Sequence, residues 1–158
     1  MQGRTNARLA AVQALYQMEA TGVGVEGVID EFRKHRLGGE IEGDLLHDAD
    51  DDFFADLVRG VVRAQLKIDP LIQRNLADKW TLARLDATVR AILRTAAYEL
   101  IHRRELSPRA VIDEYLEIAN AFFDVEERKF VNALLDALWR ERRDEDAGKR
   151  PRPKAKRT

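Results

Sequence analysis

Hydrophobic positions along this chain recur at intervals of three and four residues, which is the spacing of amphipathic α-helices. The first such segment spans residues 6–20, and Gly22 and Gly24 follow it as breakers. A second, shorter segment over 25–36 ends at Gly38 and Gly39, and the polar stretch 37–48 predicts a loop. The stripe of the first helix consists of Leu9, Val12, Leu15 and Tyr16.

The next helix is expected to begin beside a run of aspartates. Asp50, Asp51 or Asp52 is suited to cap it and to complement its N-terminal dipole. Further along, Asp69-Pro70 predicts a break or kink, although Pro70 equally suits the first turn of a following helix. The apolar face of this helix consists of Phe54, Leu57, Val58, Val61 and Val62.

The C-terminal half carries three further stripes. One runs from Leu85 to Leu100, and Ser107-Pro108 then supplies an N-cap hydroxyl followed by a proline suited to the first helical position. Asp124 is a candidate cap for the last helix. The last two stripes consist of Val111, Ile112, Tyr115, Leu116, Ala119 and Phe122, and of Phe130, Val131, Leu134, Leu135 and Leu138.

No segment alternates with the period of a strand, so the sequence predicts an all-α fold of six to seven helices. Beyond Trp139 the chain is polar apart from two alanines and contains Pro151 and Pro153. We therefore expect a helical domain over residues 1–142, with subdomains of about 1–80 and 81–142, and a disordered basic tail over 143–158.

Charge is distributed unevenly along the 158 residues, although the formal net charge is only −1. Six of the 27 lysines and arginines lie between Lys149 and Arg157 with no acid among them, which leaves 21 basic against 28 acidic residues elsewhere. The stretch 40–56 is strongly acidic. Basic chain ends are suited to bind polyanionic partners. The alternative interpretation is that the basic tail only increases solubility.

Several kinds of chemistry lack their usual motifs. The chain has no cysteine, so disulfides and cysteine-based metal sites are excluded, and no glycine-rich phosphate-binding motif appears. Asp48, Asp50 and Asp52 imitate a calcium loop, but Phe53 and Arg59 stand where glycine and a bidentate glutamate are required. We expect no catalytic residue, no metal and no cofactor. No signal peptide or membrane-length apolar run is apparent, which favours the cytoplasm.

Two groups of basic and aromatic residues suggest a polyanion site. The first consists of Arg4, Arg8, Gln13 and Tyr16, and the second of Arg128, Lys129 and Phe130. Arginine neutralises phosphate, and an aromatic ring can stack on an unpaired base. Both rings also lie on apolar stripes, and a ring in such a position belongs to the core more often than it serves as a stacking platform.

Four motifs in order resemble the NusB family of bacterial transcription antitermination factors. They are Ala11-Val12-Gln13-Ala14-Leu15-Tyr16, the segment Ile92–Leu100, the residues from Pro108 to Ala119, and Lys129-Phe130-Val131-Asn132-Ala133-Leu134-Leu135-Asp136. The resemblance runs from about Arg4 to about Leu138.

The resemblance implies two packed three-helix bundles and an activity of binding without catalysis. It implies that the chain joins NusE, a small-subunit ribosomal protein, and that together they hold boxA RNA for an RNA polymerase antitermination complex with other Nus factors, notably in ribosomal RNA operons. It implies an RNA surface of Arg4, Arg8, Gln13, Tyr16, Glu126, Arg128, Lys129 and Phe130. Because the partner is basic, we expect Asp113, Glu114 and Glu117 to contact it.

Thr5 and Asn6 stand where the family's opening segment is often dense in arginine. Fewer phosphate contacts predict weaker RNA binding and a shallower salt dependence. An alternative interpretation is therefore a helical adaptor, homodimeric or heterodimeric, that binds protein and little RNA.

Overall fold

The computed structural model describes residues 2–37 and 48–148 of the chain. Over these residues the fold consists of α-helices and one short 3-10 helix, without strands, in agreement with the all-α prediction. Most of the expected loop 37–48 and the basic segment from Lys149 lie outside the described residues. The elements are α1 (Gln2–Thr21), α2 (Val25–His35), α3 (Asp51–Gln73), η1 (Leu82–Arg84), α4 (Ala87–His102), α5 (Pro108–Phe122) and α6 (Val125–Gly148).

The predicted caps fix where three of the helices begin. Asp50 accepts a hydrogen bond from Phe53 N at 3.0 Å, Ser107 Oγ accepts one from Ala110 N at 3.2 Å, and Asp124 Oδ1 accepts one from Glu127 N at 3.2 Å. These bonds satisfy amide groups that have no partner within the helix. Asp86, which the sequence analysis did not single out, caps α4 in the same way.

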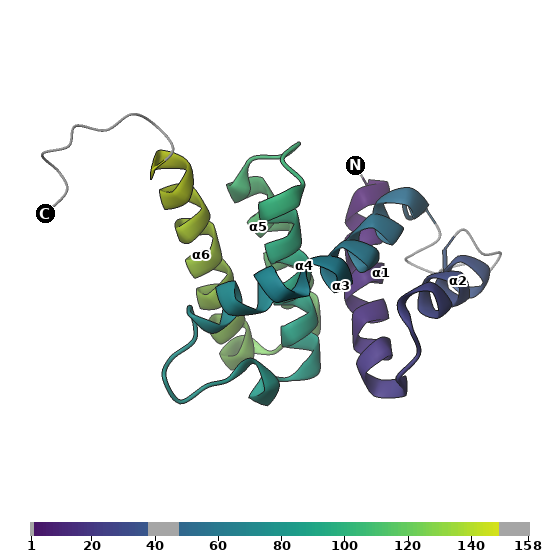
Figure 1. Cartoon of the computed structure of the whole chain (residues 1–158), viewed down its shortest axis with the longest axis horizontal. Coiled ribbons are helices and arrows are strands. Elements are labelled where there is room, and N and C mark those ends of the chain that lie inside the picture. The colour runs from purple at the N-terminus through teal and green to yellow at the C-terminus, as the bar shows by residue number, and fades with distance from the viewer. Residues whose placement is uncertain (1, 38–47, 149–158) are drawn as a thin grey trace, which may run out of the picture.

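The six helices form two sets of three (Figure 1). Helices α1 and α2 lie at one end, α5 and α6 lie at the other, and the long α3 crosses in front of α4 between them. The α3–α4 contact is the most extensive among the described helices, and α1 packs on α3, α4 and α5 as well. The two sets therefore share one continuous core, and packing in this core fixes the positions of the helices relative to one another.

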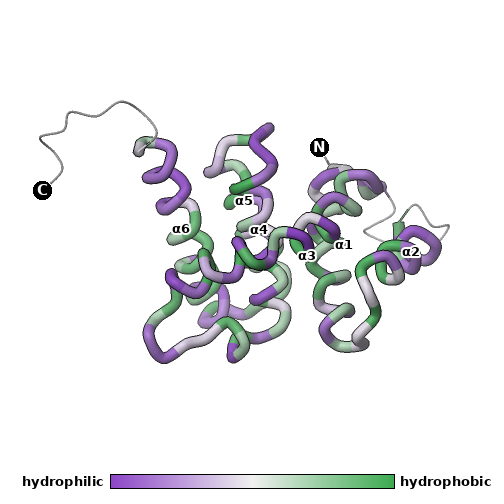
Figure 2. Tube along the Cα trace, in the orientation of Figure 1, coloured by the Kyte–Doolittle hydropathy of each residue, from purple (hydrophilic) through white to green (hydrophobic). Residues whose placement is uncertain are grey.

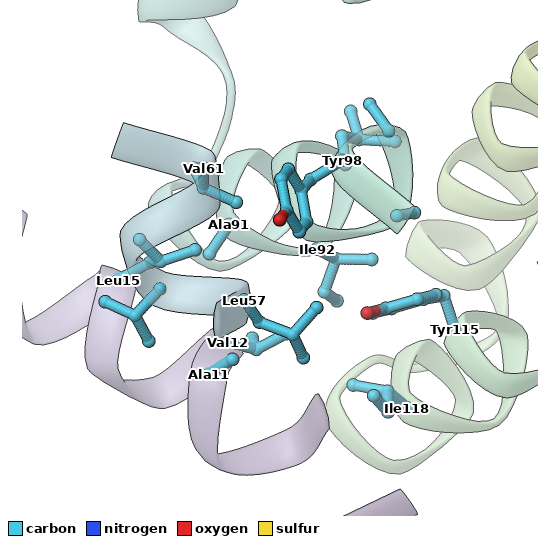
Figure 3. Packing of buried hydrophobic residues seen from close by; sticks show 14 of the residues in the cluster. Ala11, Val12, Leu15, Leu57, Val61, Ala91, Ile92, Tyr98, Tyr115 and Ile118 are labelled. Atoms are coloured by element: carbon cyan, nitrogen blue, oxygen red, sulfur yellow. The ribbon is translucent and has the colours of Figure 1, made fainter. Parts of the chain in front are cut away.

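Amphipathic faces from both sets supply this core. Apolar and polar residues are interspersed along most helices (Figure 2), and the buried apolar ones form one hydrophobic cluster. Figure 3 shows Val12, Leu57 and Ile92, from α1, α3 and α4, meeting near Tyr115 of α5. All four side chains are almost entirely buried.

Pro70 lies inside α3, so the helix does not break at this position and Pro70 does not begin a following helix. The helix continues to Gln73 although Pro70 has no amide hydrogen to donate. Ile68 and Ile72 are both buried and lie four residues apart, on one side of the helix. Packing of this face against the core stabilises the helix on both sides of the proline. Only the last turn of α3 follows Pro70.

The last helix also extends past the expected end of the domain at residue 142. Arg142 is 7% exposed, and its Nε donates a hydrogen bond to Leu100 O at 2.6 Å. It also pairs with Asp146 one turn later. Residues 143–148 are therefore helical and not part of a disordered tail, although this end of α6 is hydrophilic in Figure 2.

Candidate nucleic-acid and protein interface

Arg8 lies at the centre of a buried hydrogen-bonded network between α1, α4 and α5. Its Nε and Nη2 donate to the two carboxylate oxygens of Glu99 at 2.7 and 2.9 Å, and its Nη1 donates to Glu114 Oε1 at 3.0 Å. The hydroxyl of the fully buried Tyr115 donates to Glu99 as well. Both charged groups of the central pair are almost inaccessible, at 1% and 2% exposed. Two hydrogen bonds between a guanidinium and a carboxylate fix the relative orientation of the two groups and also pair their opposite charges.

Burial and the charge of Glu99 shift the pKa values of Arg8 and Tyr115 in this network. Burial by itself lowers the pKa of Arg8, but the hydrogen bond and the charge of Glu99 outweigh it and raise that pKa above its ordinary value. Burial, and then the charge of Glu99, raise the pKa of Tyr115 well above its usual range. Arg8 therefore remains a cation and Tyr115 a neutral donor. The expectation that Arg8 faces RNA needs correction, because its guanidinium points inward and is only 1% exposed.

The remaining predicted residues of α1 lie closer to the surface. Arg4 donates through Nη1 to Glu105 Oε2 at 3.2 Å, and its Cζ lies 4.5 Å from the centre of the Phe53 ring. Gln13 is half-buried and accepts a hydrogen bond from Arg36 Nη2 at 2.9 Å. Tyr16 is 47% exposed, so it lies outside the core and presents a ring to the solvent.

Gln13 and Tyr16 line an open groove of about 520 Å³. Phe122, at the end of α5, supplies a second exposed ring to the groove, and Arg36 supplies a cation. A site of this volume falls in the range of small-molecule pockets and admits a nucleotide. The sequence analysis missed Arg36 because it lies 20 residues beyond Tyr16, so only the fold brings it into the groove.

The second predicted group lies at the beginning of α6. Lys129 and Glu126 are highly exposed, and their charged atoms are 4.0 Å apart. Arg128 is half-buried, and Phe130 is 38% exposed on the next turn. The Phe130 ring lies in tilted contact with Trp80, with 5.8 Å between the ring centres.

Trp80 is a further surface residue that the sequence analysis did not single out. It is 39% exposed, and the Cζ atom of Arg84 lies 5.8 Å from its ring centre. The available signal was a large aromatic residue in the polar stretch 77–81, where no apolar stripe accounts for it. Sequence spacing gave no indication that it meets Phe130, 50 positions later.

The acidic residues expected to meet a basic partner differ in their availability. Glu114 accepts hydrogen bonds from Arg8 and from Thr5 Oγ1, so it takes part in the internal network while its side chain stays 32% exposed. Asp113 is exposed but pairs with Arg109 one turn earlier at 3.2 Å. Glu117 is exposed and makes no ion pair within the part of the chain that the structure describes.

The described ranges, 2–37 and 48–148, also bear on metal binding and membrane insertion. No cluster of three or more histidine, aspartate or glutamate side chains is arranged there to hold a metal ion. None of the helices described combines the length and the apolar character that crossing a membrane requires.

The described part of the chain, with its six α-helices in two sets of three, is that of a small helical bundle protein. Exposed rings lie near the ends of α1 and α5 and at the beginning of α6. The chain belongs to the NusB family, whose family model matches residues 5–140. The transcription antitermination protein NusB of Caulobacter vibrioides is 54% identical over 144 residues, covering 91% of this chain and 97% of that protein. The corresponding protein of Bradyrhizobium diazoefficiens is 50% identical over 146 residues, covering 92% and 88%.

Solved structures give the same assignment for the fold. NusB of T. maritima superposes with a TM-score of 0.71 at 31% sequence identity, covering 87% of this chain and 91% of that one. A chain in a crystal structure of the antitermination factors NusB and NusE in complex with double-stranded RNA superposes with a TM-score of 0.68 at 25% identity, covering 89% and 98%.

Proposed function

We propose that this protein is a transcription antitermination factor that binds boxA-type single-stranded RNA together with NusE and supports read-through by RNA polymerase in ribosomal RNA operons. It acts in the cytoplasm by binding, without catalysis. The observation that carries the proposal is the exposed Tyr16 ring beside the groove, in a chain of the NusB family. A related NusB chain occurs in a complex with NusE and RNA.

The proposed RNA surface joins the groove to the beginning of α6. Tyr16 offers a ring face for an unpaired base, and the amide of Gln13 offers a donor and an acceptor for a base edge. Arg4, Arg128 and Lys129 attract phosphates. The Glu126 carboxylate can accept a hydrogen bond from an exocyclic amino group. Phe130 completes the surface, and Arg8 supports it from below by fixing α1.

The proposed NusE contact lies on α5. Glu117 is its centre, because this carboxylate is exposed and pairs with no cation among residues 2–37 and 48–148. Asp113 lies one turn earlier and would exchange its contact with Arg109 for a cation of the partner. Glu114 contributes by holding α5 against α1 through its bonds to Arg8 and Thr5.

The RNA half of the proposal is tested with boxA RNA at two salt concentrations, in the presence and absence of NusE. We expect NusE to increase the affinity. Lys129→Ala should weaken binding and lower the magnitude of the slope of log K against log salt by roughly 0.7, the contribution of one phosphate contact on a single strand. Lys34→Ala is the matched control, because Lys34 is an exposed lysine on α2 that also pairs with an acid on its own helix. Equal effects of both variants, or no gain on adding NusE, would refute the proposal.

The adaptor remains a second candidate, and the burial of Arg8 favours it by removing one cation from the expected RNA surface. Under that interpretation NusE binds while neither Lys129 nor salt alters any RNA titration. Glu117→Gln tests the protein contact itself, with Asp30→Asn as the control that removes another exposed carboxylate, on α2. We expect weaker NusE binding for the first variant only.

A further inference from the structure

Trp80 and Phe130 form an exposed aromatic pair on the surface. Their exposed fractions are 39% and 38%, and their ring planes meet at 49°. One ring comes from the segment before η1 and the other from the second turn of α6. Single exposed rings are common on proteins, but two in mutual contact leave a continuous apolar face that is only half covered.

The backbone around Trp80 is held in place before any ligand arrives. Gln73, at the end of α3, donates through Nε2 to Trp80 O at 2.9 Å and accepts from Leu82 N through Oε1 at 2.8 Å. Trp80 N also donates to Ala77 O at 2.8 Å. Hydrogen bonds on both sides of the residue fix the backbone that carries the indole, so binding there requires little ordering of this segment.

Cations accompany the pair. The guanidinium carbon of Arg84 lies 5.8 Å from the indole centre, and its Nη1 donates to Lys79 O at 3.2 Å. Arg84 makes no ion pair among the residues that the structure describes. Lys129 directly precedes Phe130 and is highly exposed, with only a long contact to Glu126. Arg84 therefore supplies a cation directly beside the Trp80 ring, and Lys129 supplies an exposed one next to Phe130 in the sequence.

We propose that Trp80 and Phe130 form a stacking site for one unpaired nucleobase, with Arg84 binding the phosphate next to it. This inference rests on the proposed RNA binding and adds a second point of contact to it. The segment from Arg84 to Thr88 connects the two places, because Asp86 and Thr88 line the Tyr16 groove. In Figure 1 the end of α1, η1 and the beginnings of α4 and α6 all lie at the lower end of the molecule.

The chemistry of the site favours a nucleotide over an apolar protein segment. Stacking of a base on an aromatic side chain is sequence-tolerant and strong, and each base carries a phosphate within reach of a neighbouring arginine. An apolar peptide would cover the rings but leave Arg84 without an anion. A base with its phosphate satisfies both features at once.

The chain contains two tryptophans, which makes the proposal directly measurable. Trp139 is half-buried further along α6, beside Arg109 and Arg143. In the full chain carrying Trp139→Phe, tryptophan fluorescence reports on Trp80 alone. We expect boxA RNA to quench it with the same dissociation constant that labelled RNA gives by anisotropy. Trp80→Phe is the matched counterpart, and its remaining tryptophan should not respond.

Affinity provides the second measurement. Trp80→Ala should weaken RNA binding roughly 5- to 150-fold, the range measured for loss of one base-stacking side chain. Trp139→Phe should leave the affinity unchanged. Circular dichroism melting of both variants shows whether folding is preserved. If Trp80→Ala unfolds the protein, Arg84→Gln replaces it, and its salt slope should be shallower by roughly one single-strand phosphate contact, about 0.7.

The outcomes distinguish failure of this inference from failure of the proposed function. RNA that binds normally to Trp80→Ala and leaves Trp80 fluorescence unchanged overturns this inference while the proposed function stands. Quenching by NusE alone, without any response to RNA, overturns it in favour of a protein contact. Absence of RNA binding to every form of the chain overturns the proposed function, and this inference with it.

Discussion

Replacing Arg8 with methionine tests whether the buried network is what joins α1 to α4 and α5. Methionine has a similar length and no charge, so it fills much of the space but removes the cation. Glu99, at 2% exposed, then keeps only the hydroxyl of Tyr115 as a donor, and Glu114 keeps only Thr5. The variant therefore leaves a buried carboxylate without its counter-charge.

The size of the effect follows from that burial. Removing one partner of a buried ion pair destabilises a protein by about 3–5 kcal/mol, because the remaining charge is desolvated without compensation. Since each kcal/mol shifts the melting temperature of a domain of this size by roughly 2–4 °C, we expect a decrease of about 6–20 °C. Arg59→Met is the control, because Arg59 makes an equivalent two-point contact with Glu26 at the surface. Exposed pairs contribute about 0–1 kcal/mol.

Thermal and urea unfolding monitored by circular dichroism measure both variants. The triple variant with Arg8→Met, Glu99→Leu and Tyr115→Phe should recover most of the loss, because it removes the stranded polar groups as well. Equal melting temperatures for Arg8→Met and Arg59→Met would refute the argument that burial makes the Arg8 pair different. Failure of the triple variant to recover stability would show that packing, and not charge, dominates.

Three further predictions concern other parts of the fold. Gly60→Ala should destabilise by roughly 1–3 kcal/mol in urea unfolding, because a Cβ there would lie 2.1 Å from the Tyr98 ring, whereas the same change in an open helix is stabilising. Asp50→Ala should lower the unfolding free energy by about 1 kcal/mol through loss of the α3 cap. Hydrogen bonding from Arg90 lowers the pKa of Glu19 below its ordinary 4.5, so its stabilisation is present above that pH and is lost as the pH falls through the lowered value. Glu19→Gln should therefore make the stability less dependent on pH below 4.5.

Helix positions could be predicted from the sequence because burial follows a period of three to four residues and because caps are local. Ser107 and Asp124 were identified from their own neighbourhoods, and the structure confirms both. The errors arose where a contact distant in sequence decides the outcome. Pro70 is tolerated because Ile68 and Ile72 pack on the core, and α6 continues because Arg142 bonds to Leu100 of α4.

The candidate site was less accessible to sequence reasoning, because exposure is a property of the assembled fold. Tyr16 and Phe130 occupy apolar stripes yet face the solvent, whereas Arg8 looks like a surface charge yet is buried. An arginine is buried only where carboxylates from other helices meet it, and Glu99 lies 91 positions away. No local pattern carries that information.

The burial of Arg8 also changes how an RNA titration of this protein should be interpreted. Loss of a phosphate contact weakens binding and makes the salt dependence shallower, and this is the effect expected for Lys129. Arg8 touches no ligand in this arrangement, but it fixes α1 against α5, and the groove takes Tyr16 from the first and Phe122 from the second. A substitution at Arg8 should therefore weaken RNA binding with an unchanged salt slope, because it displaces the rings and removes no counterion release. A shallower slope for Arg8 variants would mean that the guanidinium leaves its buried network and reaches the RNA.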